Sequence, residues 1–186
     1  MSAHSLVTAP PGRAAARVRL RPTMQSDLPY VLSLEQDPEN LPFITPWERT
    51  QHEGAIRFPD FRHFVIEAGA ALDAAGFLIL IGCRSRHHSL ELKRMVVQGK
   101  GGGVGRAALR AAKKIAFDDL GAHRLWLDVK THNQRAKALY DSEGFLVEGL
   151  LRESVRTEAG YESLVVMSML QREFASRRGQ SLEVAA

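Results

Sequence analysis

The sequence predicts a mixed α/β domain, on the basis of its length, its composition and the order of its periodic segments. The chain has 186 residues, which suit one hydrophobic core and leave little room for a second. Hydrophobic residues make up 45% and charged residues 25%, as in an ordinary globular protein. Segments with strand or helix periodicity follow in the order strand, helices, three strands, helix, strand, helix, two strands. We expect a domain over residues 15–172, between flexible tails over residues 1–14 and 173–186.

The first part of this domain is expected to hold one strand and two helices. Arg17–Pro22 alternates in the manner of a strand, and Ser26 and Asp27 can cap a helix that follows. One side of that helix consists of Leu28, Val31, Leu32 and Leu34. Prolines punctuate the segment over residues 38–59, which leaves room for one short helix over residues 51–56.

Three strands are expected next, over Phe64–Ala68, Gly76–Cys83 and Ser89–Val97. The second is apolar at consecutive positions, which indicates burial on both faces. A long helix follows a glycine-dense loop and carries Ala108, Ala112, Ile115 and Ala116 before it ends at Gly121. The remaining elements are a strand over Arg124–Val129, a helix over Asn133–Glu143 stopped by Gly144, and strands over Phe145–Glu153 and Ser163–Leu170.

Composition excludes several classes of protein. Lys and Arg exceed Asp and Glu by only 25 to 21, a weak basis for a nucleic-acid partner, and we expect none. The single cysteine, Cys83, excludes an internal disulfide and a cysteine-only zinc site, and the histidines lack ligand spacing, so we expect no metal. The longest apolar run, Gly76–Gly82, is too short to cross a bilayer, and the first residues lack the pattern of a secretory signal. We expect a cytoplasmic protein, monomeric or homodimeric, with no membrane partner.

The loop Gly99–Gly105 is the first segment that indicates a ligand. Five of its seven residues are glycine. Without a Cβ, the backbone N–H groups can approach a ligand closely, and the start of the next helix adds a partial positive charge. The loop therefore predicts a site for a phosphate or pyrophosphate, against the alternative of a flexible connector.

Three phosphate-binding schemes compete for this loop. A P-loop needs Ser or Thr after its lysine, whereas Lys100 is followed by Gly101. A dinucleotide fingerprint can be placed over residues 103–108 with Asp128 as its ribose acid. That fingerprint belongs to a parallel strand–helix–strand unit, usually the first in its domain, and here it would lie in the middle of the chain. Coenzyme A is the third candidate.

The loop resembles that of the GNAT family of N-acetyltransferases. The family's loop has the form Arg/Gln-x-x-Gly-x-Gly/Ala, and Lys100, Gly103 and Gly105 occupy the corresponding positions. Lys100 departs from the usual Arg or Gln. A second register would use Gln98, Gly101 and Gly103. The register from Lys100 is preferred because the family's helix normally begins directly after the final glycine.

A second motif supports the resemblance. Asn133–Phe145 matches the family's Asn-x6-Tyr-x3-Gly-Phe segment, with Tyr140 as its tyrosine. The final part resembles the ribosomal-protein acetyltransferase branch (RimJ/RimL-like) through Leu150–Arg152, Tyr161 and Val165–Met169. The resemblance runs from Val18 to Leu170 and is strongest from Glu91 onward.

The resemblance implies a mostly antiparallel central sheet, flanked by helices, whose parallel fourth and fifth strands splay apart around acetyl-CoA, the acetyl donor. Those strands would be Ser89–Val97 and Arg124–Val129. The residues expected to bind the coenzyme are Met95, Val96, Val97, Lys100, Gly101, Gly102, Gly103, Val104, Gly105, Arg106 and Asn133. One N–H of the strand would bind the thioester oxygen, and the loop would hold the pyrophosphate. Arg106 has a solvated helix face as its alternative role, and Asn133 that of a helix cap.

Two residues are candidates for catalysis. The resemblance implies that Tyr140 gives a proton to the departing thiolate, with a core aromatic as the alternative. Glu91 is the candidate base for the amine. Alternation places Glu91, Lys93 and Met95 on one face, so a salt bridge with Lys93 that lowers the pKa of Glu91 is the alternative role.

The implied function is an acetyl-CoA-dependent N-acetyltransferase in which a primary amine attacks the thioester directly. The acceptor would be a protein or peptide α-amine or a small-molecule amine. Candidate contacts to it are Trp47, Arg49, Arg152 and Tyr161. A non-catalytic coenzyme A-binding sensor or scaffold is the alternative function, and the presence of Tyr140 and Glu91 favours the enzyme.

Overall fold

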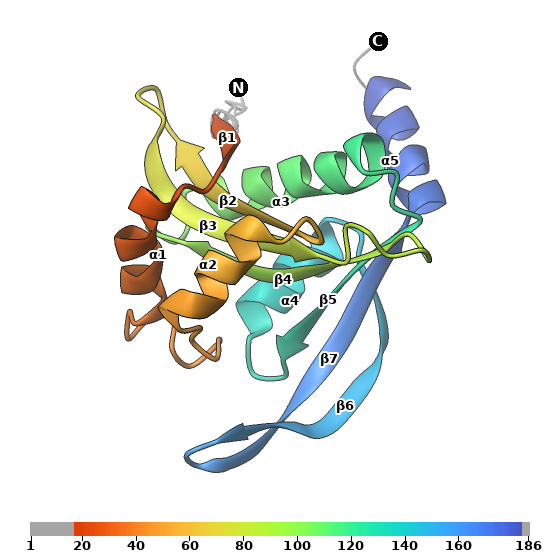
Figure 1. Ribbon diagram of the computed structural model, residues 1–186. Coiled ribbons are helices and arrows are strands. Elements are labelled where there is room, and N and C mark those ends of the chain that lie inside the picture. Colours follow the sequence, from red (N-terminus) through yellow and green to blue (C-terminus); the bar gives the residue numbers. More distant parts are fainter. Residues whose placement is uncertain (1–16, 184–186) are drawn as a thin grey trace, which may run out of the picture.

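A seven-stranded sheet forms the centre of the computed structural model, which describes residues 17–183 and the side chains of residues 17–177 (Figure 1). The strands are β1 (Val18–Pro22), β2 (Phe61–Ala68), β3 (Asp73–Ile81), β4 (Ser89–Val97), β5 (Arg124–Lys130), β6 (Leu146–Thr157) and β7 (Gly160–Leu170). They lie in the order β1-β2-β3-β4-β5-β7-β6, and neighbours are antiparallel except for the parallel pair β4 and β5. This arrangement confirms the fold class expected from the sequence. The N-terminal tail expected over residues 1–14 lies outside the described residues.

The expected helices connect the strands, with boundaries shifted by a few residues, and a further helix follows the last strand. They are η1 (Gln25–Asp27), α1 (Leu28–Glu35), α2 (Arg49–Arg57), α3 (Val104–Lys114), η2 (Ile115–Asp119), α4 (Gln134–Ser142) and α5 (Gln171–Glu183). The element η1 is a 3₁₀-helix, and η2 is a π-helical extension of α3. Asp27 does not cap α1 with its side chain; its carboxylate instead accepts the Met24 N–H at 2.7 Å and pairs with Arg21.

Two hydrophobic cores cover the two faces of the sheet. On one face, α3 and α4 pack on the strands, with Leu109 and Tyr140 in the same cluster as Leu125. On the other face, α1 packs on β3 and β4, with Val31 against Phe77. The apolar centre of β3 contributes to both cores, which confirms the expected burial of that strand on both faces.

A β-bulge at Lys93 divides β4 into two parts. Two successive residues of β3 pair with Arg94 and Leu92, so Lys93 between them has no partner in the ladder. An extra residue reverses the alternation of side chains beyond it. Met95 therefore packs against the α3/α4 core together with Leu92, away from Glu91. The expectation that Met95 shares the face of Glu91 was wrong for this reason.

The strand β3 approaches β4 closely at Gly76. This glycine has a φ of 153°, and a Cβ on it would overlap the carbonyl oxygen of Val96. Glycine is required at this position because no other residue leaves room for the neighbouring backbone. The close approach fixes Val96 and Val97 from the β3 side.

The C-terminal part differs from the expected flexible tail. The described residues from 171 to 183 form helix α5, which leaves the sheet directly after β7 (Figure 1). Phe174 stacks on Phe117 of η2 with ring centroids 4.8 Å apart. This aromatic contact supplies the packing that the polar composition of residues 173–186 did not reveal.

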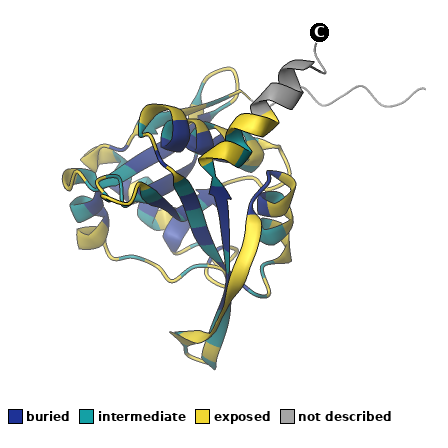
Figure 2. Cartoon of the chain, turned by 90° about the vertical axis from the view of Figure 1, so that its right-hand side faces the viewer, coloured by how far each residue is buried: buried dark blue, intermediate teal, exposed yellow. Residues whose placement is uncertain are grey.

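The strand β6 is the exposed edge of the sheet. Its residues are almost all exposed, as the yellow strand in Figure 2 shows, and they include Leu146, Val147, Leu150 and Leu151. The β6–β7 hairpin extends beyond the other strands (Figure 1).

Candidate active site

The parallel strands β4 and β5 separate after a short paired stretch. Three residue pairs join them, from Ser89–Arg124 to Glu91–Trp126. Beyond this point β5 continues to pair with β7 as far as Lys130, and β4 continues to pair with β3. The backbone edges of β4 and β5 that face one another beyond Glu91 therefore have no partner in the sheet. Unpaired backbone groups of this kind form an opening that a ligand with amide groups can fill.

The glycine loop lies at the end of β4, beside this opening. Gly99, Gly101 and Gly103 have φ values of 67°, 97° and 82°, which glycine adopts without strain. Gly103 is the N-cap of α3, so the helix begins at Val104, two residues earlier than the preferred register requires. Gly105 lies in the first turn of α3. The observed helix start therefore favours the register from Gln98, whose final glycine is Gly103, over the preferred one. In either register Gly101–Gly103 lie at the helix start, where free N–H groups and the helix dipole favour an anion.

Arg106 and Lys100 both have acidic partners. Arg106 donates to Glu143 at 2.7 Å and to Ser142 at 3.0 Å. Lys100 pairs at 3.0 Å with Glu39, whose side chain is exposed. The Arg106 side chain is exposed on its helix face and at the same time pairs with the buried carboxylate of Glu143, the residue that directly follows α4.

Glu143 collects three cations between α3 and α4. Arg106, Arg110 and Lys113 all donate to its carboxylate at 2.7–3.0 Å. Burial by itself raises the pKa of Glu143, but these hydrogen bonds outweigh it and lower the pKa to about 2. Lys113 is buried and also donates to the Glu143 carbonyl. These four side chains together carry an excess of two positive charges at the start of α3 and along it.

Asn133 caps helix α4. Its side-chain oxygen accepts the Ala136 N–H at 3.1 Å, as its chemistry predicted. The side-chain amide N–H groups have no hydrogen-bond partner among the described residues. Asn133 lies in the connection between β5 and α4, and these donors are the part of it that a ligand can use.

Tyr140 lies on α4 and is buried in the α3/α4 core. Its ring is 5.9 Å from that of Phe145. Burial raises the pKa of Tyr140 to about 12, and the negative charge of Asp128 adds to the shift. The hydroxyl group is therefore a proton donor over the whole physiological range of pH. The core position and the acid role are compatible, because only the hydroxyl needs to reach a ligand.

Glu91 lies where β4 and β5 separate and is 8% exposed. Lys93 pairs with it at 3.1 Å, as alternation predicted. Burial raises the pKa of Glu91, and Asp128 raises it further, while Lys93 lowers it in part. Lys93 thus lowers this pKa, as expected of the salt bridge, but burial outweighs it and the net direction is upward. A raised pKa increases the proton affinity of the carboxylate.

The comparisons with known proteins agree with this geometry. The family profile of the acetyltransferase (GNAT) domain matches residues 17–146. The chain belongs to the GNAT acetyltransferase family. Escherichia coli spermidine N(1)-acetyltransferase is 26% identical over 185 residues, which cover 91% of this chain and 96% of that protein. A Bacillus subtilis protein provisionally named a ribosomal N-acetyltransferase is 28% identical, over 61% of this chain and 63% of its own length.

A solved structure extends the likeness to three dimensions. The spermidine N-acetyltransferase from Vibrio cholerae, in complex with CoA and spermine, superposes with a TM-score of 0.77 at 25% identity. The alignment covers 85% of this chain and 98% of that one. The unpaired edge of β4, the glycine loop and the excess positive charge along α3 fit a coenzyme with amide and phosphate groups. This GNAT chain is accordingly an acetyl-CoA-dependent N-acetyltransferase that transfers acetyl to a primary amine.

The candidate acceptor residues of the acetyltransferase lie in two separate places. Trp47 precedes α2. The guanidinium carbon of Arg94 lies over the Trp47 ring, 5.4 Å from the centre of that ring. Arg49 is exposed on α2 and pairs with Glu53 at 2.9 Å. The other two candidates, Arg152 and Tyr161, lie exposed on the β6–β7 hairpin. The described contacts do not bring these four side chains together.

The segment between α1 and α2 crosses the outer end of the opening. The Pro42 carbonyl accepts hydrogen bonds from Lys130 at 3.0 Å and from His132 at 3.1 Å, both after the separation of β5. On the β4 side, Lys100 donates to the Glu39 carbonyl at 3.0 Å. Hydrogen bonds thus hold the segment over residues 39–42 to the residues that follow β4 and to the end of β5.

A buried polar network near the bulge escaped the sequence interpretation. Arg94 pairs with Glu35 of α1 and donates to the Thr45 carbonyl at 2.8 Å. His52 of α2 contacts His63 of β2 at 3.0 Å, and burial lowers the pKa of His63 to about 3. This network ties α1 and α2 to β4. No sequence signal shows it, because its members are widely separated along the chain.

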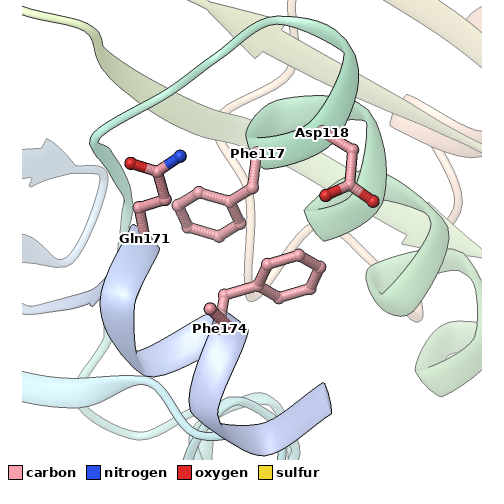
Figure 3. A pocket seen from close by; sticks show the side chains of 5 residues that line it. Phe117, Asp118, Gln171 and Phe174 are labelled. Atoms are coloured by element: carbon pink, nitrogen blue, oxygen red, sulfur yellow. The ribbon is translucent and has the colours of Figure 1, made fainter. Parts of the chain in front are cut away.

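A hollow of about 260 Å³ lies outside this region, between η2 and α5 (Figure 3). Phe117, Asp118, Gln171, Phe174 and Ala175 line it. None of the candidate site residues contributes to it.

Among the described residues, no group of His, Cys, Asp and Glu could hold a metal ion. Within the described part of the chain, no helix is both long and apolar enough to span a membrane.

Proposed function

We propose that the acetyltransferase acts on a small cationic amine of the polyamine type. The observation that carries this proposal is the opening between β4 and β5, which has the buried carboxylate of Glu91 at its base. A carboxylate there suits an ammonium group that must lose a proton before it reacts. The spermidine acetyltransferase from E. coli, which matches over nearly its whole length, supports the same acceptor class.

A protein α-amine is the second candidate acceptor. The RimJ/RimL-like features of the final strands favour it, together with the partial match to the B. subtilis relative. That match covers 63% of the relative, against 96% for the spermidine acetyltransferase, so the polyamine class has the broader support. Cys83 is a free cysteine, which suits a reducing compartment. This supports a cytoplasmic location for either activity.

We infer that the donor lies along the unpaired edge of β4. When bound, acetyl-CoA supplies an activated acetyl thioester. Met95, Val96 and Val97 would offer backbone groups to the pantetheine arm, and one N–H among them would stabilise negative charge on the thioester oxygen. The amides of residues 101–105 would hold the pyrophosphate, and Asn133 would donate its side-chain N–H. Lys100 and Arg106 would each exchange a carboxylate partner for phosphate.

Glu91 and Tyr140 would move the two protons of the reaction. Glu91 would accept a proton from the acceptor ammonium group, so that the amine becomes a nucleophile. Tyr140 would donate its hydroxyl proton to the leaving sulfur. The raised pKa of each group suits its role, because Glu91 gains proton affinity and Tyr140 stays protonated. Trp47, Arg49, Arg152 and Tyr161 are retained as candidate contacts to the acceptor.

A panel of amines tests the proposed acceptor class. We expect release of CoA thiol from acetyl-CoA in the presence of spermidine or putrescine, and little release with a peptide that has a free N-terminus. Mass spectrometry of the products identifies the acetylated amine. Release with the peptide alone would replace the polyamine class by the α-amine class. No release with any amine would contradict both.

The Tyr140→Phe substitution tests the acid. We expect kcat to fall about 100-fold, the usual contribution of a positioned proton donor. The KM for acetyl-CoA and the unfolding midpoint should change little, because the ring remains in its core site. Steady-state kinetics with both substrates provide the measurement. An unchanged kcat, or equal losses in kcat and in affinity for the donor, would remove Tyr140 from this role.

The Glu91→Gln substitution tests the base through the pH–rate profile. We expect the loss in kcat/KM to grow as the pH falls from about 9 to 6, because more of the acceptor then arrives as ammonium. The Lys93→Met variant is the matched control. Lys93 lowers the pKa of Glu91, so its removal should move the acidic limb of the profile to higher pH. Profiles of the same shape for all three proteins would exclude Glu91 as the base.

A further inference from the structure

Asp128 occupies a position on β5 that the site described above leaves without a role. Trp126 of β5 is the residue opposite Glu91, at the last pair that joins the two strands. Asp128 follows two residues later and therefore lies on the same face as Trp126. It pairs only with Val166 of β7, on the side away from β4. The register thus brings Asp128 to the opening just beyond Glu91.

The carboxylate of Asp128 has no hydrogen bond or ion pair among the described residues, although the residue is half-buried. The buried carboxylates elsewhere in this part of the chain all have a cationic partner. They are Glu35 with Arg94, Glu67 with Arg21, Glu91 with Lys93 and Glu143 with Arg106. A partly desolvated carboxylate without a protein partner takes its hydrogen-bond donors from water or from a ligand.

The neighbouring cations are already engaged. Lys130, two residues further along the same face, pairs with Glu162 at 2.8 Å and donates to the Pro42 carbonyl. The guanidinium group of Arg124 lies 5.6 Å from the ring centre of Trp126 and pairs with Glu148. Neither is arranged to neutralise Asp128. The negative charge of Asp128 also raises the pKa of both Glu91 and Tyr140, which agrees with a position between the two.

We propose that Asp128 binds the positive charge of the acceptor amine, in an ammonium subsite formed by Asp128, Glu91 and Trp126. This inference rests on the proposed function and names the residue that selects its substrate class. Asp128 supplies a charge-assisted hydrogen bond, while the half-buried indole of Trp126 gives an apolar wall and a face that attracts cations. The subsite therefore selects aliphatic ammonium groups over neutral compounds of equal length.

Isothermal titration calorimetry tests the subsite directly. Putrescine is titrated into the complex of the protein with CoA, which cannot react, for the wild type and for Asp128→Asn. We expect the Kd for putrescine to rise about 10- to 100-fold in the variant, as for the loss of a charged hydrogen bond. The Kd for CoA should stay the same. Asp73→Asn, which removes an exposed carboxylate at the start of β3, is the matched control and should bind as the wild type does.

A second measurement uses the wild-type protein alone and does not depend on the folding of a variant. We expect 1,4-butanediol, the neutral counterpart of putrescine, to bind at least 10-fold more weakly. Equal affinity for the diol, or an unchanged Kd in Asp128→Asn, would overturn the role of Asp128 while the acetyltransferase activity stands. A wild-type protein that binds CoA but no amine would instead overturn the proposed acceptor class and the subsite with it.

Discussion

The early end of hydrogen bonding between β4 and β5 is the constraint on which the rest of the structure depends. After three residue pairs, β4 remains paired only with β3, and β5 only with β7. Backbone N–H and C=O groups need partners when water is excluded, so a separation of this kind is stable only beside solvent or a ligand. A donor with peptide-like amide groups satisfies that need. Glu91, Asp128 and the helix that carries Tyr140 all lie where the strands separate.

Buried ion pairs fix the helices that flank the separated strands. On the β4 side, Arg94 joins the strand to Glu35 of α1 directly after the bulge at Lys93. On the other face, Glu143 joins α4 to α3 through three cations. Breaking a buried pair leaves an uncompensated charge and is costly, so these contacts fix the helices in position. The opening therefore needs no contact across it to keep its shape.

Local sequence signals were sufficient for the order of the elements and for the two motifs. Ser89–Val97 was predicted with the bounds of β4, and Asn133 was predicted as the cap of α4. Contacts between segments that lie far apart in the sequence could not be predicted from these local signals. The bulge depends on how β3 meets β4, and alternation alone misplaced Met95. Arg106 was left with no partner because Glu143 lies 37 residues away.

Hydrogen–deuterium exchange with and without acetyl-CoA tests the central claim most directly, because it reports on individual backbone amides. The account predicts slower exchange at Met95–Val97 and at Gly101–Gly105 when acetyl-CoA is present, with little change in β1 and β2. The residues that line the hollow beside Phe174 are the internal control, and their exchange rates should not change. Protection confined to that hollow, or no protection at saturating acetyl-CoA, would contradict the assignment of the donor to the opening between β4 and β5.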